Sequence, residues 1–278
     1  MEYENKLINF RNRIRSGDRL YGTFVKSPTS ENVEIVAALG FDFVIIDAEH
    51  APLGRREVDQ LCLAAKAAGI PALVRVNDAS AATLLSPLDS GAAGVVVPHV
   101  VSGEMARQIA VSCKYRPGGR GFSAATRSAG YGSRTMTEAI DQSNLATSLI
   151  VQIEDEEALH DLQGILACDD VDGVLIGRAD LAVSLGEASA SSQRVMEVVK
   201  DICRVCANLN KSALIFAASA KDARALLDLG ATVAVVGSDQ AYLRDAARET
   251  IKNLKNPEFG SEKKSVAIST EEGVRGER

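Results

Sequence analysis

The sequence predicts a (β/α)8 barrel, the TIM-barrel fold, and three observations support this prediction. Short runs rich in β-branched residues alternate regularly with longer segments of helical spacing. The short runs are almost continuously apolar, as parallel strands covered on both faces are. Eight such strand–helix pairs occupy roughly 250 residues of the chain, which is the size typical of this barrel.

The elements follow one another in a regular order. The expected strands share a short apolar run and are residues 20–26, 41–47, 71–76, 94–100, 148–154, 173–177, 212–217 and 232–239. The expected helices share Ala- and Leu-rich helical spacing and are residues 31–39, 55–68, 81–90, 103–113, 156–167, 193–209, 220–229 and 240–254. Glycine ends several helices just before a strand, as in LGFDF and AAGIPALV. A doubly wound open sheet is disfavoured because no GxGxxG follows the first strand and no Walker motif occurs.

Two segments fall outside this alternation. Residues 114–147, which begin KYRPGGRGF, are expected to form a long irregular insertion, and a connection of that length is usually functional or flexible. The tail, 256–278, has almost no apolar content and is expected to be disordered. We therefore expect one barrel domain over residues 1–255, followed by this tail.

Charge and composition restrict the class of function. The formal net charge is −6, so the chain lacks the basic excess that nucleic acid or an anionic membrane surface requires. The N-terminal residues are charged throughout, unlike a signal peptide, and no apolar run is long enough to span a membrane. With five scattered cysteines, the chain is expected to be cytoplasmic with reduced thiols. Cys203 and Cys206 form a CxxC, which we interpret as a pair of buried helix residues.

Polar side chains gather where the expected strands end, and this end of a (β/α)8 barrel carries the chemistry. Gln152 and Glu154 are two residues apart on one strand, so both side chains face the same way. A buried polar pair is costly without a partner. A divalent cation is a natural partner, and Asp180 after the next strand would supply a second carboxylate. The alternative is a helix-capping Glu154 and an ion pair between Asp180 and Arg178.

Two further residues at the strand ends suggest acid–base chemistry. Arg75 interrupts the apolar strand ALVRV, and its donors suit a carboxylate or an enolate oxygen beside such a cation. The alternative for Arg75 is a buried ion pair with Asp47 or Glu49. His50 lies among carboxylates, where a base of near-neutral pKa would be useful, and we expect Asp89 to orient it.

The other two histidines have less specific surroundings. His99, in VVVPHV, is interpreted as a structural residue. The alternative is a residue that supports the catalytic residues without contacting the substrate. His160 falls in the helical segment EEALHDLQ and is expected on the surface.

Six motifs occur in chain order: G-FDFVIID-x-EH-x-P, P-x-LVRV, LDSGAAGVVVPHV, Y-x-P-x-G-RG, QIE and DGVLIG-x-x-DL-x-x-SLG. Together they resemble the class II pyruvate aldolases, the HpcH/HpaI aldolase family of the citrate lyase-like superfamily, from about residue 20 to residue 254. The resemblance implies a barrel of the phosphoenolpyruvate/pyruvate-binding type whose last helix is exchanged between subunits, in homo-oligomers from dimer to hexamer. It also implies reversible aldol cleavage of a 4-hydroxy-2-keto acid or diacid to pyruvate and an aldehyde. The cofactor would be Mg²⁺, Mn²⁺ or Co²⁺, which stabilises an enolate.

The same resemblance implies where metal and substrate bind. Glu154 of QIE and Asp180 of the DL motif resemble the metal ligands. Gln152 is similar to a neighbour that contacts the substrate or a water on the metal. Ala179 resembles a residue whose backbone N–H binds the substrate carboxylate, and Asp47 resembles one that lines the same pocket.

The resemblance also implies catalytic roles. Arg75 resembles the residue that steadies the enolate oxygen, and His50 of the EH motif resembles the general base. Asp89 of LDSGA resembles the acid that raises the basicity of that histidine.

Arg178 departs from the family pattern, in which this position usually holds proline. The expected role is a second anion clamp for a substrate with an extra carboxylate, to which Arg120 and Arg127 of the insertion could add. The alternative is an ion pair with Asp180 or a side chain that points to solvent. The departure favours a di- or tricarboxylate substrate such as oxaloacetate.

Other functions stay open on the same scaffold. One is a citrate-synthase-like condensation of acetyl-CoA with oxaloacetate, as in members used in siderophore biosynthesis. Another is a non-catalytic barrel that binds keto acids, which would predict a lost site residue, and none is lost. A Schiff-base route is disfavoured because Lys26 is the lysine at a strand end, and its strand carries no other expected site residue.

Overall fold

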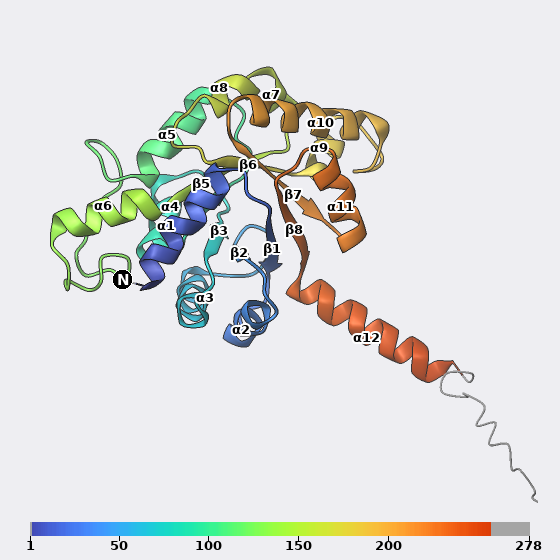
Figure 1. Cartoon of the computed structure of the whole chain (residues 1–278), viewed down its shortest axis with the longest axis horizontal. Coiled ribbons are helices and arrows are strands. Elements are labelled where there is room, and N and C mark those ends of the chain that lie inside the picture. The colour runs from blue at the N-terminus through green and yellow to red at the C-terminus, as the bar shows by residue number, and fades with distance from the viewer. Residues whose placement is uncertain (1, 257–278) are drawn as a thin grey trace, which may run out of the picture. The chain divides into compact units, whose positions relative to one another are not determined.

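The computed structural model of the chain describes residues 2–256 and contains a closed barrel of eight parallel strands (Figure 1). Neighbouring strands in the barrel are neighbours in sequence from β1 to β8, and β1 pairs with β8 to close it. The predicted fold is therefore confirmed. The strands are β1 Leu20–Val25, β2 Phe43–Asp47, β3 Ala72–Arg75, β4 Gly94–Val97, β5 Ser148–Ile153, β6 Gly173–Ile176, β7 Ser212–Ala217 and β8 Val233–Ser238.

The helices alternate with these strands along the chain, and those that connect one strand to the next lie on the outside of the barrel (Figure 1). They are α1 Glu2–Arg15, α2 Ser30–Ala38, α3 Arg55–Ala68, α4 Ala81–Asp89, α5 Gly103–Cys113, α6 Met136–Ala146, α7 Glu156–His160, α8 Leu162–Leu166, α9 Arg178–Ser184, α10 Gln193–Asn208, α11 Ala220–Asp228 and α12 Asp239–Lys255. The segment 156–167, expected as one helix, is divided at Asp161 into α7 and α8. Residues 178–184, to which the sequence assigns no helix, form the short helix α9.

Side chains alternate between the inside and the outside of the barrel along each strand. Phe43 and Ile45 of β2 belong to the cluster that fills the interior, whereas Val44 and Ile46 pack outward beneath the helices. The same alternation places Ile150 of β5 inside. This period of two decides which polar residues reach the interior at the carboxyl ends of the strands.

The polar residues predicted at the strand ends are in register with the interior positions. Asp47 is two residues beyond Ile45, and it pairs across the ladder with Arg75 of β3. Gln152 and Glu154 continue the interior face of β5, as the sequence predicts. The barrel therefore turns a linear pattern of alternate polar residues into one polar layer above an apolar interior.

The opposite, amino-terminal end of the barrel is covered by α1, which the sequence analysis did not assign. Leu7, Phe10 and Ile14 of α1 belong to the interior cluster, and the Phe10 ring lies 5.3 Å from that of Phe43. These residues have helical spacing, but the charged residues between them conceal the pattern. Phe43 itself fills space that is open because position 22 is glycine: a Cβ on Gly22 would lie 2.4 Å from the Phe43 ring.

The insertion 114–147 contains the helix α6 and is not wholly irregular. Thr135 and Glu138 form a capping box at its start, a signal present in the sequence TMTE. The insertion connects a helix to a strand, so it lies at the amino-terminal end of the barrel, where Arg134 bonds Glu4 of α1 at 2.7 Å. It is therefore away from the strand ends that carry the predicted site.

Contacts divide the chain into two units, one through Ala241 and one from Tyr242, so the boundary falls within α12. The described part of the second unit continues this helix to Lys255. Four expectations stay predictions: exchange of the last helix between subunits, assembly into a homo-oligomer, a single domain over residues 1–255 and a cytoplasmic location. The predicted disordered tail, 256–278, lies outside the described residues apart from Asn256. Within residues 2–256 no helix has the length and apolar character to cross a membrane.

Candidate active site

A cavity of about 290 Å³ opens at the carboxyl ends of the barrel strands. Residues from seven of the eight strands or the loops after them line it, because the barrel brings the ends of strands that are distant in sequence together. The lining residues are Phe24, Lys26, His50, Arg75, Gln152, Leu175, Ile176, Gly177, Arg178, Ala179, Asp180, Phe216, Gly237 and Ser238. Six of the predicted site residues are therefore in one cavity: His50, Arg75, Gln152, Arg178, Ala179 and Asp180.

Gln152 and Glu154 form a buried polar pair at the edge of this cavity. Gln152 Nε2 donates to Glu154 Oε2, and the backbone N–H of His99 donates to Glu154 Oε1 at 3.0 Å. The Glu154 residue is only 2% exposed. Gly177 of the next strand passes so close that a Cβ there would lie 2.8 Å from both Cβ and Oε2 of Glu154. The position of the Glu154 carboxylate is thus defined on three sides.

Glu49, His99 and Glu154 each offer a ligand atom, and these atoms lie within 4.8 Å of one another. Glu49 and His99 follow β2 and β4, so both belong to the same end of the barrel as Glu154. His99 has φ of 54°, an uncommon conformation for a residue with a side chain. Its Nδ1 lies 3.0 Å from Asp155 Oδ2 and 3.4 Å from Glu154 Oε1. Such clusters of carboxylates and imidazole suit a divalent cation.

The electrostatics and hydrogen bonding of this cluster fit a cation. Burial raises the pKa of Glu154, the hydrogen bond from Gln152 offsets part of that effect, and the nearby Glu49 charge adds to it. The hydrogen bond to Asp155 raises the pKa of His99. Gln152 Oε1 is buried and has no hydrogen-bond partner among the described residues. A cation would supply both the missing positive charge and a partner for an unpaired oxygen.

Arg75 is held in place by two acids. Its Nε and Nη2 donate to the two carboxylate oxygens of Asp47 at 2.9 and 2.8 Å, and its Nη1 lies 3.2 Å from Glu49 Oε2. Asp47 is fully buried and also contacts Lys26 Nζ at 3.0 Å. Burial alone would raise the pKa of Asp47, but the hydrogen bonds and charge of Arg75, with those of Lys26, hold it below its ordinary value. Asp47 therefore supports the cavity wall from beneath and does not itself line it.

His50 reaches the cavity from the loop after β2, and its side chain is 52% exposed. Its backbone N–H donates to Asp47 Oδ1 at 3.2 Å, which fixes the loop. The carboxylate nearest to its ring among the described ion pairs is that of Glu49, with Oε2 3.8 Å from Nε2. Glu49 thus lies between Arg75 and His50.

Asp89, which we expected beside His50, is the last residue of α4. A helix of this barrel ends near the amino-terminal face, so Asp89 and His50 of one chain lie at opposite ends of the barrel. The Asp89 carboxylate accepts a hydrogen bond from Arg120 Nη2 at 2.6 Å. The structure does not bring Asp89 to His50 within the chain, and its predicted role is untested.

Arg120 and Arg127 of the insertion have partners of their own at that same end. The buried Arg120 guanidinium bonds Asp89 and lies 4.5 Å from the Tyr115 ring centroid. Arg127 makes two bonds to Asp59, at 2.8 and 3.0 Å. Neither lines the cavity at the strand ends, so neither adds to an anion clamp there within one chain.

Arg178 neither pairs with Asp180 nor points to solvent. Its Nη2 donates to Asp222 Oδ2 at 2.5 Å and to the carbonyl oxygen of Phe216 at 3.1 Å. Ala179 and Asp180, the next two residues of α9, line the same cavity. Within the described residues Asp180 has no ion pair, so its carboxylate is available to a ligand.

Some residues of the cavity were not predicted. Lys26 and Phe24 both line it, whereas we expected no site residue on their strand. Phe24 and Phe216 form an aromatic wall, with ring centroids 5.9 Å apart. Glu49 and His99 were noticed in the sequence but given no ligand role. Their position directly after strands β2 and β4 is the signal that could have identified them.

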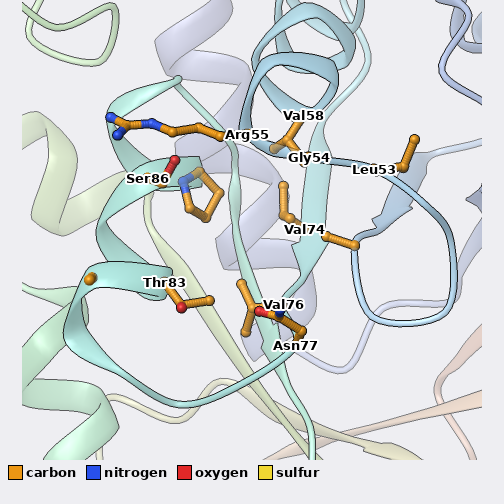
Figure 2. Close-up of a pocket in the computed structure, with 12 residues that line it drawn as sticks. Leu53, Gly54, Arg55, Val58, Val74, Val76, Asn77, Thr83 and Ser86 are labelled. Atoms are coloured by element: carbon orange, nitrogen blue, oxygen red, sulfur yellow. The ribbon is translucent and has the colours of Figure 1, made fainter.

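A second hollow, of about 340 Å³, lies between α3 and α4 on the outer side of β3. Figure 2 shows Val58, Val74 and Val76 on its wall, with Thr83 and Ser86 of α4 facing them. This hollow is larger than the cavity at the carboxyl ends of the strands, but its lining contains no carboxylate and no imidazole. Acid–base or metal chemistry needs such groups, so the cavity at the strand ends is the candidate active site.

The cysteines show no second site. Cys203 and Cys206 are both buried and free, as predicted. Burial raises the pKa of Cys203 to about 11 and that of Cys206 to about 12, which suppresses the reactive thiolate.

Comparison with protein families decides the affiliation of the chain. Residues 20–246 match the model of the HpcH/HpaI aldolase/citrate lyase family. The chain belongs to this family. The match covers the whole barrel, so the predicted resemblance is confirmed.

Relatives of this family are similar along most of their length. A hydroxypyruvate/pyruvate aldolase from Roseobacter denitrificans is 32% identical over 247 residues, covering 87% of this chain and 95% of the relative. A 2-keto-3-deoxy-L-rhamnonate aldolase from Shigella sonnei is 33% identical over 254 residues, covering 90% and 94%. These relatives support a lyase in the chain described here.

Solved structures of the family have the same fold. A family member from Burkholderia cenocepacia superposes with a TM-score of 0.85 at 26% identity, covering 89% of this chain and 99% of the other. The citrate synthase SbnG superposes with a TM-score of 0.78 at 27% identity, covering 88% and 96%. The scaffold is thus shared by proteins named for two different reactions.

Proposed function

We propose that the chain is a divalent-metal-dependent carbon–carbon lyase that reversibly cleaves a 4-hydroxy-2-keto acid to pyruvate and an aldehyde. The observation that carries this proposal is the buried Gln152–Glu154 pair, which lies beside Glu49 and His99 at the edge of a cavity that also contains Arg75. The aldolase relatives agree with this class of reaction.

Glu154 is the residue best placed to hold the cation, because its carboxylate is buried and positioned by neighbours on both sides. Glu49 and His99 are within reach of the same point, and Asp180 is a carboxylate of the cavity without an ion pair among the described residues. A divalent cation bound there would supply a Lewis acid for the keto oxygen of the substrate.

Arg75 is the donor for the oxygen that becomes negative when the C3–C4 bond breaks. Each Nη of a guanidinium carries two hydrogens, so the contacts with Asp47 and Glu49 leave one on each nitrogen. The bonding electrons move into the enolate, and a fixed guanidinium that lines the cavity stabilises that charge without reorganisation. Asp47 orients Arg75 through its two hydrogen bonds.

His50 is the proposed general base for the C4 hydroxyl. It lines the cavity and is exposed enough to exchange its proton with water. Glu49, 3.8 Å from its Nε2, would stabilise the imidazolium that forms. Electrons from the O–H bond then form the aldehyde carbonyl as the C3–C4 bond breaks.

Metal removal and restoration test the proposal. Pyruvate release from a 4-hydroxy-2-keto acid, measured with lactate dehydrogenase, should stop in excess EDTA and return with Mg²⁺, Mn²⁺ or Co²⁺. Glu154→Gln keeps the size of the side chain but should lose Mn²⁺ binding, as measured by electron paramagnetic resonance. Undiminished activity in EDTA would refute the metal requirement. The rival Schiff-base route would instead show a mass increase at Lys26 after treatment with pyruvate and borohydride.

A second candidate function is a condensation of acetyl-CoA with oxaloacetate. The similarity to the citrate synthase SbnG favours it, because that protein shares the barrel at 27% identity. Release of free thiol from acetyl-CoA, dependent on oxaloacetate and measured with a thiol reagent, would support this function. Pyruvate release without thiol release would support the aldolase.

A further inference from the structure

His99 converges on the carboxylate of Glu154 with two of its groups. Its backbone N–H donates to Glu154 Oε1 at 3.0 Å, and its ring Nδ1 lies 3.4 Å from the same oxygen. The φ of His99 is 54°, in the left-handed region, where a residue with a side chain is strained. Strained residues of this kind are concentrated at functional sites, so the conformation suggests that the position of the ring matters for function.

Asp155 orients the His99 ring. It is the N-cap residue of α7, where the side chain of an aspartate usually accepts a backbone N–H of the helix, but it makes no such bond. Its Oδ2 lies instead 3.0 Å from His99 Nδ1. A histidine that binds a metal commonly donates one ring N–H to a carboxylate, which leaves the other nitrogen with a lone pair for the cation. Asp155 gives His99 this arrangement, with Nε2 as the nitrogen available to a cation.

The cluster around His99 offers three protein ligands. One ligand atom from each of Glu49, His99 and Glu154 lies within 4.8 Å of the others. Gln152, which lines the adjacent cavity and is 2% exposed, has a buried Oε1 with no hydrogen-bond partner among the described residues. Buried polar atoms are rarely left unpaired in native proteins, so a cation or a water bound to it belongs beside this oxygen. Three protein ligands with open positions are also typical of catalytic zinc sites.

The imidazole of His99 bears on which cation the cluster prefers. Mg²⁺ is bound through oxygen, usually by one or two carboxylates together with water and substrate. An imidazole nitrogen instead suits first-row transition metals, for which the affinity of a given site rises from Mn²⁺ through Fe²⁺ to Co²⁺ and Ni²⁺. Glu49 and Glu154 alone would therefore suit Mg²⁺, and the addition of His99 favours the transition metals.

We propose that His99, oriented by Asp155, is a ligand of the catalytic cation and selects a first-row transition metal such as Co²⁺ over Mg²⁺. This ligand is additional to the carboxylates of the proposed function. The inference rests on that function, because it places the cation at Glu154, and it names the class of cation that the proposed function leaves open.

Nitrogen coordination tests the inference without a measurement of activity. Protein with ¹⁵N-labelled histidine and unlabelled protein are each loaded with Mn²⁺, and electron spin echo envelope modulation detects nitrogen bound to the cation. The wild type should show a histidine nitrogen on Mn²⁺. His50→Ala and His160→Ala should retain this signal, and His99→Asn should lose it. Asparagine tolerates the left-handed conformation and keeps the backbone N–H on Glu154, so His99→Asn removes only the imidazole.

Metal preference gives a second readout. Isothermal titration calorimetry measures Kd for Co²⁺ and for Mg²⁺ in each protein. Loss of a residue that merely supports a ligand lowers metal affinity by about 10- to 100-fold, so loss of the ligand itself in His99→Asn should weaken Co²⁺ binding by at least about 10-fold. Mg²⁺ binding depends on the oxygen ligands and should change much less. His160→Asn, the same substitution at an exposed histidine of α7, is the matched control and should change neither Kd.

Each outcome has a definite meaning. A wild type that binds Mn²⁺ without a histidine nitrogen overturns the inference, and so does a signal that is lost in His50→Ala and kept in His99→Asn. An equal loss of Co²⁺ and Mg²⁺ affinity in His99→Asn, or no loss of either, also overturns it, because the ring then has no part in metal selection. If the wild type binds none of Mg²⁺, Mn²⁺ and Co²⁺, the proposed function fails. If it binds them without nitrogen coordination, only the role of His99 fails.

Discussion

Gly177→Ala should disable the candidate metal site without a change in any polar residue. A Cβ at this position would lie 2.8 Å from Glu154 Cβ and Oε2 and 3.2 Å from Gln152 Nε2, whereas ordinary van der Waals contact begins at 3.4 Å. The Glu154 side chain would therefore have to retreat by about 0.6 Å, several times the ~0.2 Å tolerance of a metal–ligand distance. The Glu154 Cβ is near the backbone, so a rotation at the end of the side chain cannot relieve the contact.

The expected cost divides between stability and metal binding. Overpacking of this kind costs about 1–3 kcal/mol of unfolding free energy. Displacement of a ligand should lower Mn²⁺ affinity by about 10- to 100-fold. Isothermal titration calorimetry with Mn²⁺ measures the affinity, and urea unfolding measures the stability. Gly121→Ala is the matched control, because a Cβ there meets no atom within 4 Å and its φ is not positive. A folded Gly177→Ala protein that binds Mn²⁺ as tightly as the wild type would refute the placement of the metal at Glu154.

Three further predictions concern single residues. His50→Ala should keep Mn²⁺ affinity and lower kcat by about 10²- to 10⁴-fold, whereas the exposed His160→Ala should change neither; wild-type turnover in His50→Ala would exclude this histidine as the base. Phe10→Ala, at the end of the barrel closed by α1, should lower the free energy of unfolding by about 3–5 kcal/mol, and a loss below 1 kcal/mol in urea titrations would contradict the described packing. Burial lowers the pKa of Lys114 to about 8. Above that pH the unfolded chain therefore binds more protons than the folded chain. The free energy of unfolding of the wild type, relative to that of Lys114→Met, should rise by up to about 3 kcal/mol between pH 8 and 10.5. A difference between the two proteins that does not change with pH would refute the lowered pKa.

Local pattern was enough to predict the barrel and part of its polar layer. The continuous apolar runs of the strands indicated parallel pairing, and the spacing of Gln152 and Glu154 placed both on the inner face of β5, where the structure has them. Arg75 was predicted from one charged residue in an apolar strand. In the structure its two alternative roles coincide, because it both bonds Asp47 and lines the cavity.

Contacts between distant segments could not be predicted in the same way. The partner of Arg178 is Asp222, 44 residues further along the chain, and nothing near Arg178 in sequence indicates it. Helix α1 escaped prediction because charged residues separate Leu7, Phe10 and Ile14. Asp89 is a different case, since barrel topology alone places the end of a helix away from the strand ends. Asp89 was included in the predicted site because of the resemblance to a family, but within a single chain it does not lie at the cavity.

The most direct test of the account is whether the chain forms the pyruvate enolate and needs a divalent cation to do so. Purified protein is incubated with pyruvate in D2O, and deuterium at C3 is measured by mass spectrometry, in excess EDTA and after addition of Mg²⁺, Mn²⁺ or Co²⁺. The account predicts background exchange in EDTA and rapid exchange with at least one of these cations, abolished by Glu154→Gln. Equal exchange with and without EDTA, or no exchange with any of the three cations, would contradict it.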